Sequence, residues 1–161
     1  MSQAVEIVRE TRLDPRFPLS RRELAGLADI LLDALGLTGR TFILKLVDDR
    51  EIARLNLEFL GCPGPTNILS FPAHDAGDAE FAPDGEVGDP DDDGELLGEL
   101  ALSVDALARE TDLYGQLPLE HLARLLAHGL LHLAGFDHGE AMFDMTDAAV
   151  DRVLLESGGA A

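Results

Sequence analysis

The stretch "LLAHGLLHLAGFDHGE", residues 125–140, combines an apolar helical pattern with three histidines. His128 and His132 are four residues apart, so on a helix their side chains lie about 40° apart on one face. This spacing suits two imidazoles that bind one metal ion. Gly135 can adopt the left-handed conformation that ends a helix, which would let His138 return to the same ion.

The spacing H-x-x-x-H-x-x-G-x-x-H predicts a metal site formed by His128, His132 and His138. Each histidine alone is better explained as a core or surface residue, but the three together favour metal binding. Three neutral imidazoles leave one coordination position open, where zinc lowers the pKa of water to about 7. This ligand set suits zinc best among the abundant ions, so we expect one zinc ion.

Gly129 lies where a zinc peptidase of this spacing carries its catalytic glutamate. It supplies no carboxylate to act as general base, which disfavours peptide hydrolysis. A glycine inside a helix costs about 1 kcal/mol relative to alanine. Three explanations remain open: close packing against a strand, room for a substrate beside the metal, or simple drift.

The composition indicates one globular domain spanning residues 1–161. An apolar fraction of 46% over 161 residues is enough for a single core. No apolar run has the length of a membrane helix, and the N-terminus lacks the pattern of a signal peptide. Cys62 is the only cysteine, which excludes a disulfide within the chain and suits a reducing compartment. Together these features predict a cytoplasmic protein.

The formal net charge of −19 is concentrated in one segment. Residues 73–95 contain ten acidic residues and no Lys or Arg, so we expect a mobile loop inserted in the domain. Without this segment, 21 acidic residues remain against 12 basic ones, a net charge of −9. The body of the protein therefore offers no broad basic face for nucleic acid.

Strand and helix patterns alternate along the chain, which predicts an α/β (α+β) fold. We expect a single small mixed sheet of about four strands with about five helices in one layer, the central helix carrying His128 and His132. The expected strands are 5–10, 41–47, 66–71 and 96–104. The expected helices are 21–35, one ending near Leu60, one beginning near Ser103 or Asp105, one opening at Pro118, and 140–156.

Three segments resemble the signatures of the YbeY family, bacterial zinc-dependent endoribonucleases of rRNA maturation. "HGLLHLAGFDH" (128–138) is similar to the family's H-G-x-L-H-L-x-G-Y-D-H motif. "LNLEFLGCPGPTNILSFP" (55–72) and "LLGELALSVDAL" (96–107) resemble its other two conserved stretches, in the same order. The resemblance covers roughly residues 40–155.

The resemblance implies a cytoplasmic hydrolase that cleaves phosphodiester bonds of single-stranded RNA. The family acts in 16S rRNA 3′-end maturation and ribosome quality control. The implied partners are single-stranded rRNA, the small ribosomal subunit and its assembly proteins, with no membrane. The family's zinc ligands correspond to His128, His132 and His138.

Two positions depart from the family pattern. Leu60 stands where the family has an arginine, which would bind phosphate and stabilise charge in the transition state. Glu99 replaces an aspartate and keeps its charge. Leu60 therefore supports an alternative function, a ribosome-assembly zinc protein with weak or no catalysis.

Several further residues are candidates for the site. With His128, we consider Glu99 and Asp137 catalytic, as groups that orient a histidine or transfer a proton, although Asp137 fits a turn cap equally well. Thr66, Asn67 and Ser70 are candidate substrate-binding residues; Thr66 and Asn67 also fit turn formation. Among the residues that match no motif position, His121 is expected at a cap or the surface, and Met142 and Met145 in the core.

Overall fold

The computed structural model describes residues 4–11, 19–73, 96–115, 117–136 and 139–158. These residues form the four strands and five helices that the sequence predicts. In chain order they are β1 (Val5–Arg9), α1 (Arg21–Ala34), β2 (Thr41–Val47), α2 (Asp49–Leu60), β3 (Ile68–Pro72), β4 (Leu96–Ser103), α4 (Val104–Tyr114), α5 (Pro118–Leu133) and α6 (Glu140–Gly158). Of the acidic segment 73–95, only Ala73 lies among the described residues. No described helix is long and apolar enough to cross a membrane.

The strands form one mixed sheet in the order β1-β2-β4-β3. The pairs β1–β2 and β2–β4 are parallel, whereas β3 runs antiparallel to β4. The strand predicted at 66–71 instead begins at Ile68 and includes Pro72. Because β3 is an edge strand, Pro72 can end it without removing a hydrogen bond from a second neighbouring strand.

Side-chain N-caps fix the first residues of three helices, near the predicted positions. At α1, Ser20 and Glu23 form a reciprocal capping box. Asp48 accepts a hydrogen bond from the Glu51 backbone N–H at the start of α2, and Ser103 caps α4 in the same way. These short-range hydrogen bonds explain why the sequence alone locates these helix starts closely.

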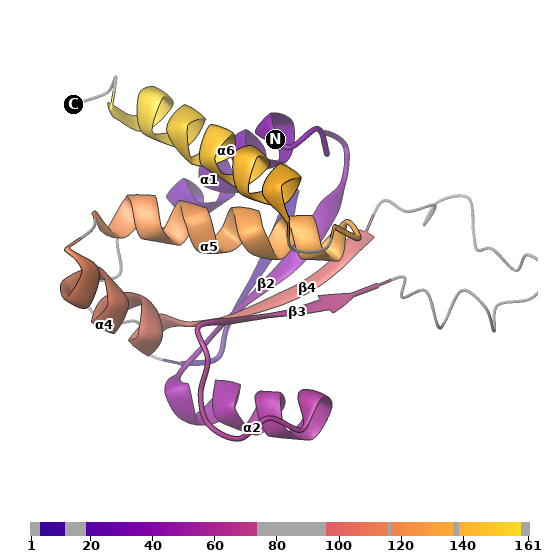
Figure 1. The fold of residues 1–161 in the computed structure, drawn as a ribbon, viewed down its shortest axis with the longest axis vertical. Helices are drawn as coiled ribbons and strands as arrows, with labels where there is room; N and C mark the ends of the chain where they lie inside the picture. Colours follow the sequence, from indigo (N-terminus) through magenta and orange to yellow (C-terminus); the bar gives the residue numbers. More distant parts are fainter. Residues whose placement is uncertain (1–3, 12–18, 74–95, 116, 137–138, 159–161) are drawn as a thin grey trace, which may run out of the picture.

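Helices α1, α5 and α6 cover one face of the sheet, and α5 lies between the sheet and α6 (Figure 1). Leu100 and Leu102 of β4 belong to the same buried cluster as Leu126 and Leu130 of α5. Because α5 is covered on two sides, most of its residues are buried. This explains why its sequence is apolar around most of the helix.

The opposite face of the sheet is covered by α2, which corrects the prediction of a single helical layer (Figure 1). Ile52 and Leu55 of α2 pack with Val47, Leu69 and Ala101 in a second buried cluster. Successive residues of a strand point to opposite faces of the sheet. Strands β2 and β4 therefore contribute side chains to both buried clusters.

Hydrogen bonds tie the start of α2 to β4 and α4. Asp49 accepts from the Ser103 hydroxyl at 2.9 Å and from the Arg109 guanidinium at 2.9 Å. Its backbone N–H donates to Asp105 at 3.0 Å. The hydrogen bond from Arg109 is the main reason that the pKa of Asp49 lies below its ordinary value. These contacts hold α2 on its face of the sheet.

Close packing accounts for Gly129, which lies in α5 directly above the sheet. A Cβ atom at this position would lie 2.8 Å from Leu100 Cδ2 and 3.2 Å from Ile68 Cδ1. Leu100 is fully buried, so its side chain has little room to move. Of the three explanations that the sequence leaves open, packing of the helix against β3 and β4 is the one that the structure supports.

The packing at Gly129 can be tested against a glycine in an open part of a helix. We expect Gly129→Ala to lower the free energy of unfolding by about 1–3 kcal/mol through overpacking. Gly26→Ala in α1 is the matched control, because a Cβ there meets nothing within 4 Å. The control should raise stability by up to about 1 kcal/mol through helix propensity. Urea unfolding of both variants measures the difference, and equal stabilisation would contradict the packing argument.

Candidate metal centre

His128 and His132 converge on one point at the surface of α5. Their Nε2 atoms lie 3.1 Å apart. The ring centroids are 4.6 Å apart and the rings are nearly perpendicular, at 82°. Both side chains are half-buried, so the pair lies at the edge of the core and can be reached from solvent.

The distance between the two Nε2 atoms fits a shared metal ion. Two nitrogen ligands of a tetrahedral zinc, each at about 2.0–2.1 Å from the ion, lie about 3.3 Å from each other. The observed 3.1 Å is close to this value. The two side chains therefore lie where two ligands of one ion would lie, and their assignment as metal ligands stays a prediction.

The other predicted ligand, His138, and the candidate Asp137 lie outside the described residues. Among the residues that are described, no further His, Cys, Asp or Glu completes a group of three with the pair. Gly139, which follows His138 in the sequence, lines the same cavity as His128. The assignment of His138 as a ligand thus remains a prediction.

Gly135 ends α5 as predicted, with a positive φ of 97°. Its N–H donates to the His132 carbonyl at 3.0 Å, and the Phe136 N–H donates to the Leu131 carbonyl at 3.0 Å. This pair of bonds is a Schellman motif, which reverses the chain directly after a helix. The chain therefore turns back within three residues of His132.

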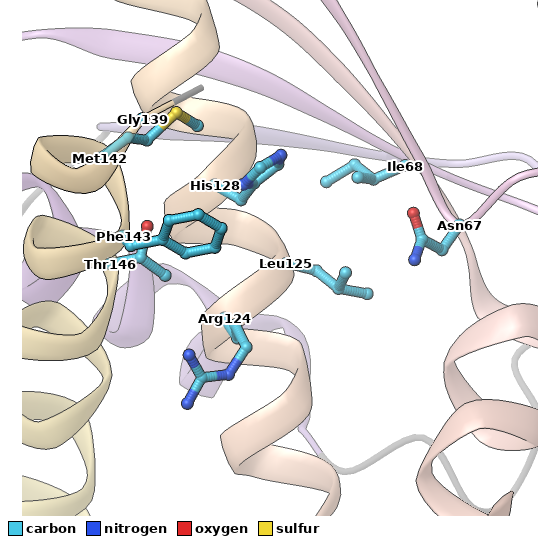
Figure 2. A pocket seen from close by; sticks show the side chains of 9 residues that line it. All are labelled: Asn67, Ile68, Arg124, Leu125, His128, Gly139, Met142, Phe143 and Thr146. Carbon is cyan, nitrogen blue, oxygen red and sulfur yellow. The ribbon is translucent and has the colours of Figure 1, made fainter. Parts of the chain in front are cut away.

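A cavity of about 250 Å³ opens beside His128, between α5, α6 and the start of β3 (Figure 2). Its polar lining comes from Asn67, Arg124, His128 and Thr146. Apolar side chains from the same elements complete the wall: Ile68, Leu125, Met142 and Phe143. A polar edge that includes His128 thus adjoins a largely apolar cavity, which is a common composition for a ligand site.

Asn67 is held in this wall by a hydrogen-bond network from α4 and α5. Its Nδ2 lies 3.3 and 3.4 Å from the two carboxylate oxygens of Glu110. His121 Nε2 lies 2.8 Å from Glu110 Oε1, and the His121 ring makes an edge contact with Tyr114. His121 is only 7% exposed, so the prediction of a cap or surface residue is wrong. A carboxylate from α4 makes its burial possible.

The structure places the other two candidate substrate residues differently. The Ser70 hydroxyl lies 3.4 Å from the Gly129 carbonyl oxygen, so it faces α5 next to the histidine pair. Thr66 is half-buried just before β3 and does not line the cavity. The structure therefore brings Asn67 and Ser70 to the α5 side of the sheet.

The structure does not bring Glu99 to the histidine pair. Leu100, its neighbour in β4, packs against Gly129 on the α5 face, so Glu99 points to the opposite face. There it pairs with Lys45 of β2 at 3.5 Å. The interpretation of Glu99 as a group that acts beside the metal is therefore corrected, because the sheet lies between them.

Sequence reasoning missed four residues of this region: Glu110, Arg124, Phe143 and Thr146. Arg124 has a signal in the sequence, because it lies one helical turn before His128 on the same side of α5. The other three come from α4 and α6, and only the packing of those helices brings them to the site.

Comparisons with known proteins agree with this fold and identify a family. Residues 21–153 match the family model described as Endoribonuclease YbeY. A protein of that name from Oleidesulfovibrio alaskensis is 52% identical over 140 residues, 81% of each chain. The one from Nitratidesulfovibrio vulgaris is 48% identical over 143 residues, covering 86% of this chain and 88% of its own. The solution structure of TM1509 from Thermotoga maritima has a similar fold, with a TM-score of 0.63 at 22% identity, covering 97% of this chain and 93% of its own.

Zinc should stabilise the folded protein through the histidine pair. At free zinc a hundredfold above the dissociation constant, binding adds about 2.7 kcal/mol, which corresponds to a Tm rise of about 5–10 °C. Calorimetry of chelator-treated protein with and without added zinc measures this rise. His132→Ala should lose it, whereas His121→Gln should keep it, because His121 binds Glu110 instead. An equal rise in His132→Ala would refute the assignment.

Proposed function

Since the chain belongs to the YbeY endoribonuclease family, we propose that it is a zinc-dependent endoribonuclease that cleaves single-stranded RNA. Its place is in the maturation of the 16S rRNA 3′ end and in ribosome quality control, in the cytoplasm. The observation that carries the proposal is the pair His128 and His132, with Nε2 atoms 3.1 Å apart at the edge of a cavity.

We assign zinc binding to His128, His132 and His138. When bound, zinc supplies a Lewis acid for a phosphodiester and positive charge at the site. The half-buried setting of His128 and His132 keeps both rings in place while leaving their Nε2 atoms within reach of a substrate. The Schellman turn at Gly135 supports the return of the chain toward these rings.

We assign the group that transfers a proton from the positions of the candidate carboxylates. Gly129 offers no carboxylate on α5, and Glu99 is paired with Lys45 on the far face of the sheet. Asp137, adjacent to the predicted third ligand in the sequence, is the carboxylate that we assign to this role. Asn67 and Ser70, on the α5 side of the sheet, are assigned to substrate contacts.

The charge of the protein suggests how RNA is recognised. With 31 acidic and 12 basic residues, the surface disfavours tight binding of free RNA, because phosphate contacts require cations. Recognition therefore relies on the small ribosomal subunit and its assembly proteins, which present the single-stranded rRNA.

A second function, ribosome assembly with weak or no catalysis, is favoured by Leu60. This residue is 59% exposed and stands at the position of the family's arginine. It ends α2, on the face of the sheet opposite to α5, so a guanidinium there would have to reach past the edge strand β3 to contact a phosphate beside His128. Arg54, on the same helix, donates from Nε, Nη1 and Nη2 to Glu51 and Glu58, so all three of its guanidinium nitrogens are engaged. The two functions differ in whether efficient catalysis requires a cation at position 60.

The proposed activity can be tested with a single-stranded RNA that carries the 3′ end of 16S rRNA. The zinc-loaded protein should cut it, and a chelator should stop the reaction. His132→Ala should slow cleavage at least about a hundredfold, the scale of losing one group that stabilises the transition state. Gel analysis of end-labelled RNA gives the rates. No cleavage by protein that retains zinc would overturn the nuclease in favour of the assembly function.

The role of the missing arginine can be tested by restoring it. Leu60→Arg should raise the cleavage rate by about tenfold or more if a guanidinium there stabilises charge on the phosphate. Leu57→Arg is the matched control, because Leu57 lies on the same helix and is 58% exposed. An equal gain in both variants would indicate general attraction of RNA, and no gain in Leu60→Arg would contradict a local role.

A further inference from the structure

The wall of the cavity beside His128 includes a threonine whose buried hydroxyl has no hydrogen-bond partner in the described part of the chain. Thr146 of α6 lines the cavity and is only 5% exposed. Its hydroxyl is buried and has no hydrogen-bond partner among the described residues. Buried hydroxyls are normally paired, because leaving one unpaired costs free energy. The hydroxyl oxygen has almost no accessible surface of its own, so a group in the cavity reaches it only after the Thr146 side chain rotates. A ligand that pairs with the rotated hydroxyl would remove the cost of leaving it unpaired.

Asn67 supplies a second polar atom, with its orientation fixed, on the β3 side of the cavity. The Glu110 carboxylate can only accept, so it takes hydrogen bonds from Asn67 Nδ2 at 3.3 and 3.4 Å. This contact fixes the orientation of the Asn67 amide, so that Oδ1 is the atom that can accept a hydrogen bond from a ligand. The cavity thus combines an acceptor from Asn67 with a hydroxyl from Thr146 that can donate or accept.

Phe143 provides an aromatic surface at the same cavity. It precedes Thr146 by three residues on α6, so both side chains lie on one face of that helix. In Figure 2 the Phe143 ring extends from α6 toward α5, beside His128 and Thr146. The ring is 64% exposed, so a planar group can stack on it without displacing core residues.

Arg124 places a cation at the lower edge of the cavity in Figure 2. Its guanidinium donates to Asp147 at 2.7 Å and lies 3.8 Å from Glu120. These exposed ion pairs are weak, and a guanidinium can retain one carboxylate contact while it donates to a phosphate oxygen. The cavity therefore has a stacking surface, two groups for a base edge and a cation for a phosphate.

We propose that this cavity is a nucleotide subsite, which holds one unpaired base of the RNA beside the histidine pair. Phe143 stacks on the base, Thr146 and Asn67 bind its hydrogen-bonding edge, and Arg124 contacts the adjoining phosphate. The volume of about 250 Å³ is below the about 300–1,000 Å³ of pockets for drug-sized ligands. It suits a single ring system, which requires single-stranded RNA, since a paired base is not free to enter.

The inference rests on the proposed function for the identity of the ligand, but it can be tested without cleavage. Nucleoside 5′-monophosphates contain a base and a phosphate and have no phosphodiester to cut. We expect AMP, GMP, CMP or UMP, added to the zinc-loaded protein, to shift the NMR signals of Phe143 and Thr146. The four nucleotides should differ in affinity, because Thr146 and Asn67 contact the edge that distinguishes the bases.

Two variants separate stacking from edge recognition. Phe143→Leu should weaken all four nucleotides by about fivefold to a hundredfold, the range of base–aromatic stacking. Thr146→Val should weaken only the preferred nucleotide and remove the difference among the four. Because Thr146→Val replaces an unpaired hydroxyl by a methyl group of similar size, its Tm should not fall. Weaker binding together with an unchanged or higher Tm would exclude a folding defect.

Matched controls lie elsewhere in the fold. Thr111→Val changes another buried threonine, whose hydroxyl donates to the Ala108 carbonyl at 3.0 Å outside the cavity. Leu155→Ala shortens an exposed apolar side chain further along α6. Both controls should bind the nucleotides as the unmodified protein does.

The outcomes distinguish this inference from the proposed function. Nucleotide binding in the cavity without any RNA cleavage would support the subsite and overturn the nuclease. Zinc-dependent cleavage with no nucleotide shifts at Phe143 or Thr146, and with unchanged base preference in Thr146→Val, would overturn the subsite alone. Shifts at these residues with a short peptide instead of the nucleotides would also overturn it.

Discussion

The contact between α5 and the sheet at Gly129 is the constraint on which the rest of the structure depends. Without a side chain at this position, the backbone of α5 approaches Leu100 and Ile68 closely. This approach fixes both the distance of α5 from the sheet and the rotation of the helix about its axis. Because His128 precedes Gly129, the same contact sets the direction in which the histidine pair faces.

One helix thus serves the core and the site at once. Leu126 and Leu130 of α5 are buried among residues of the sheet and the other helices, which anchors the helix against movement. His128 and His132 lie at the edge of this buried surface and are half-exposed. A pair of histidines on a rigid, well-packed helix retains its spacing whether or not an ion is bound, which is what the predicted metal centre requires.

Much of the fold follows from local sequence patterns, whereas the errors concern the faces of the sheet. Helix caps such as Ser20 and the spacing of His128 and His132 act over a few residues, so they can be read from the chain directly. The catalytic role predicted for Glu99 is wrong because the direction of its side chain depends on which side of β4 the later helix α5 covers. The prediction of a cap or surface position for His121 is wrong because its partner, Glu110, comes from another helix. The same non-local packing explains why Phe143 and Thr146 carry no signal in the sequence.

The end of α5 at Gly135 has an electrostatic consequence for the order of binding. His132 lies in the last turn of this helix, where the aligned peptide dipoles leave a partial negative charge. This charge favours a cation held by His132 and repels a phosphate, and the acidic surface of the protein adds to that repulsion. A zinc ion bound at the proposed site would offset this charge, so the proposal predicts that metal loading is a precondition for RNA binding and not only for chemistry.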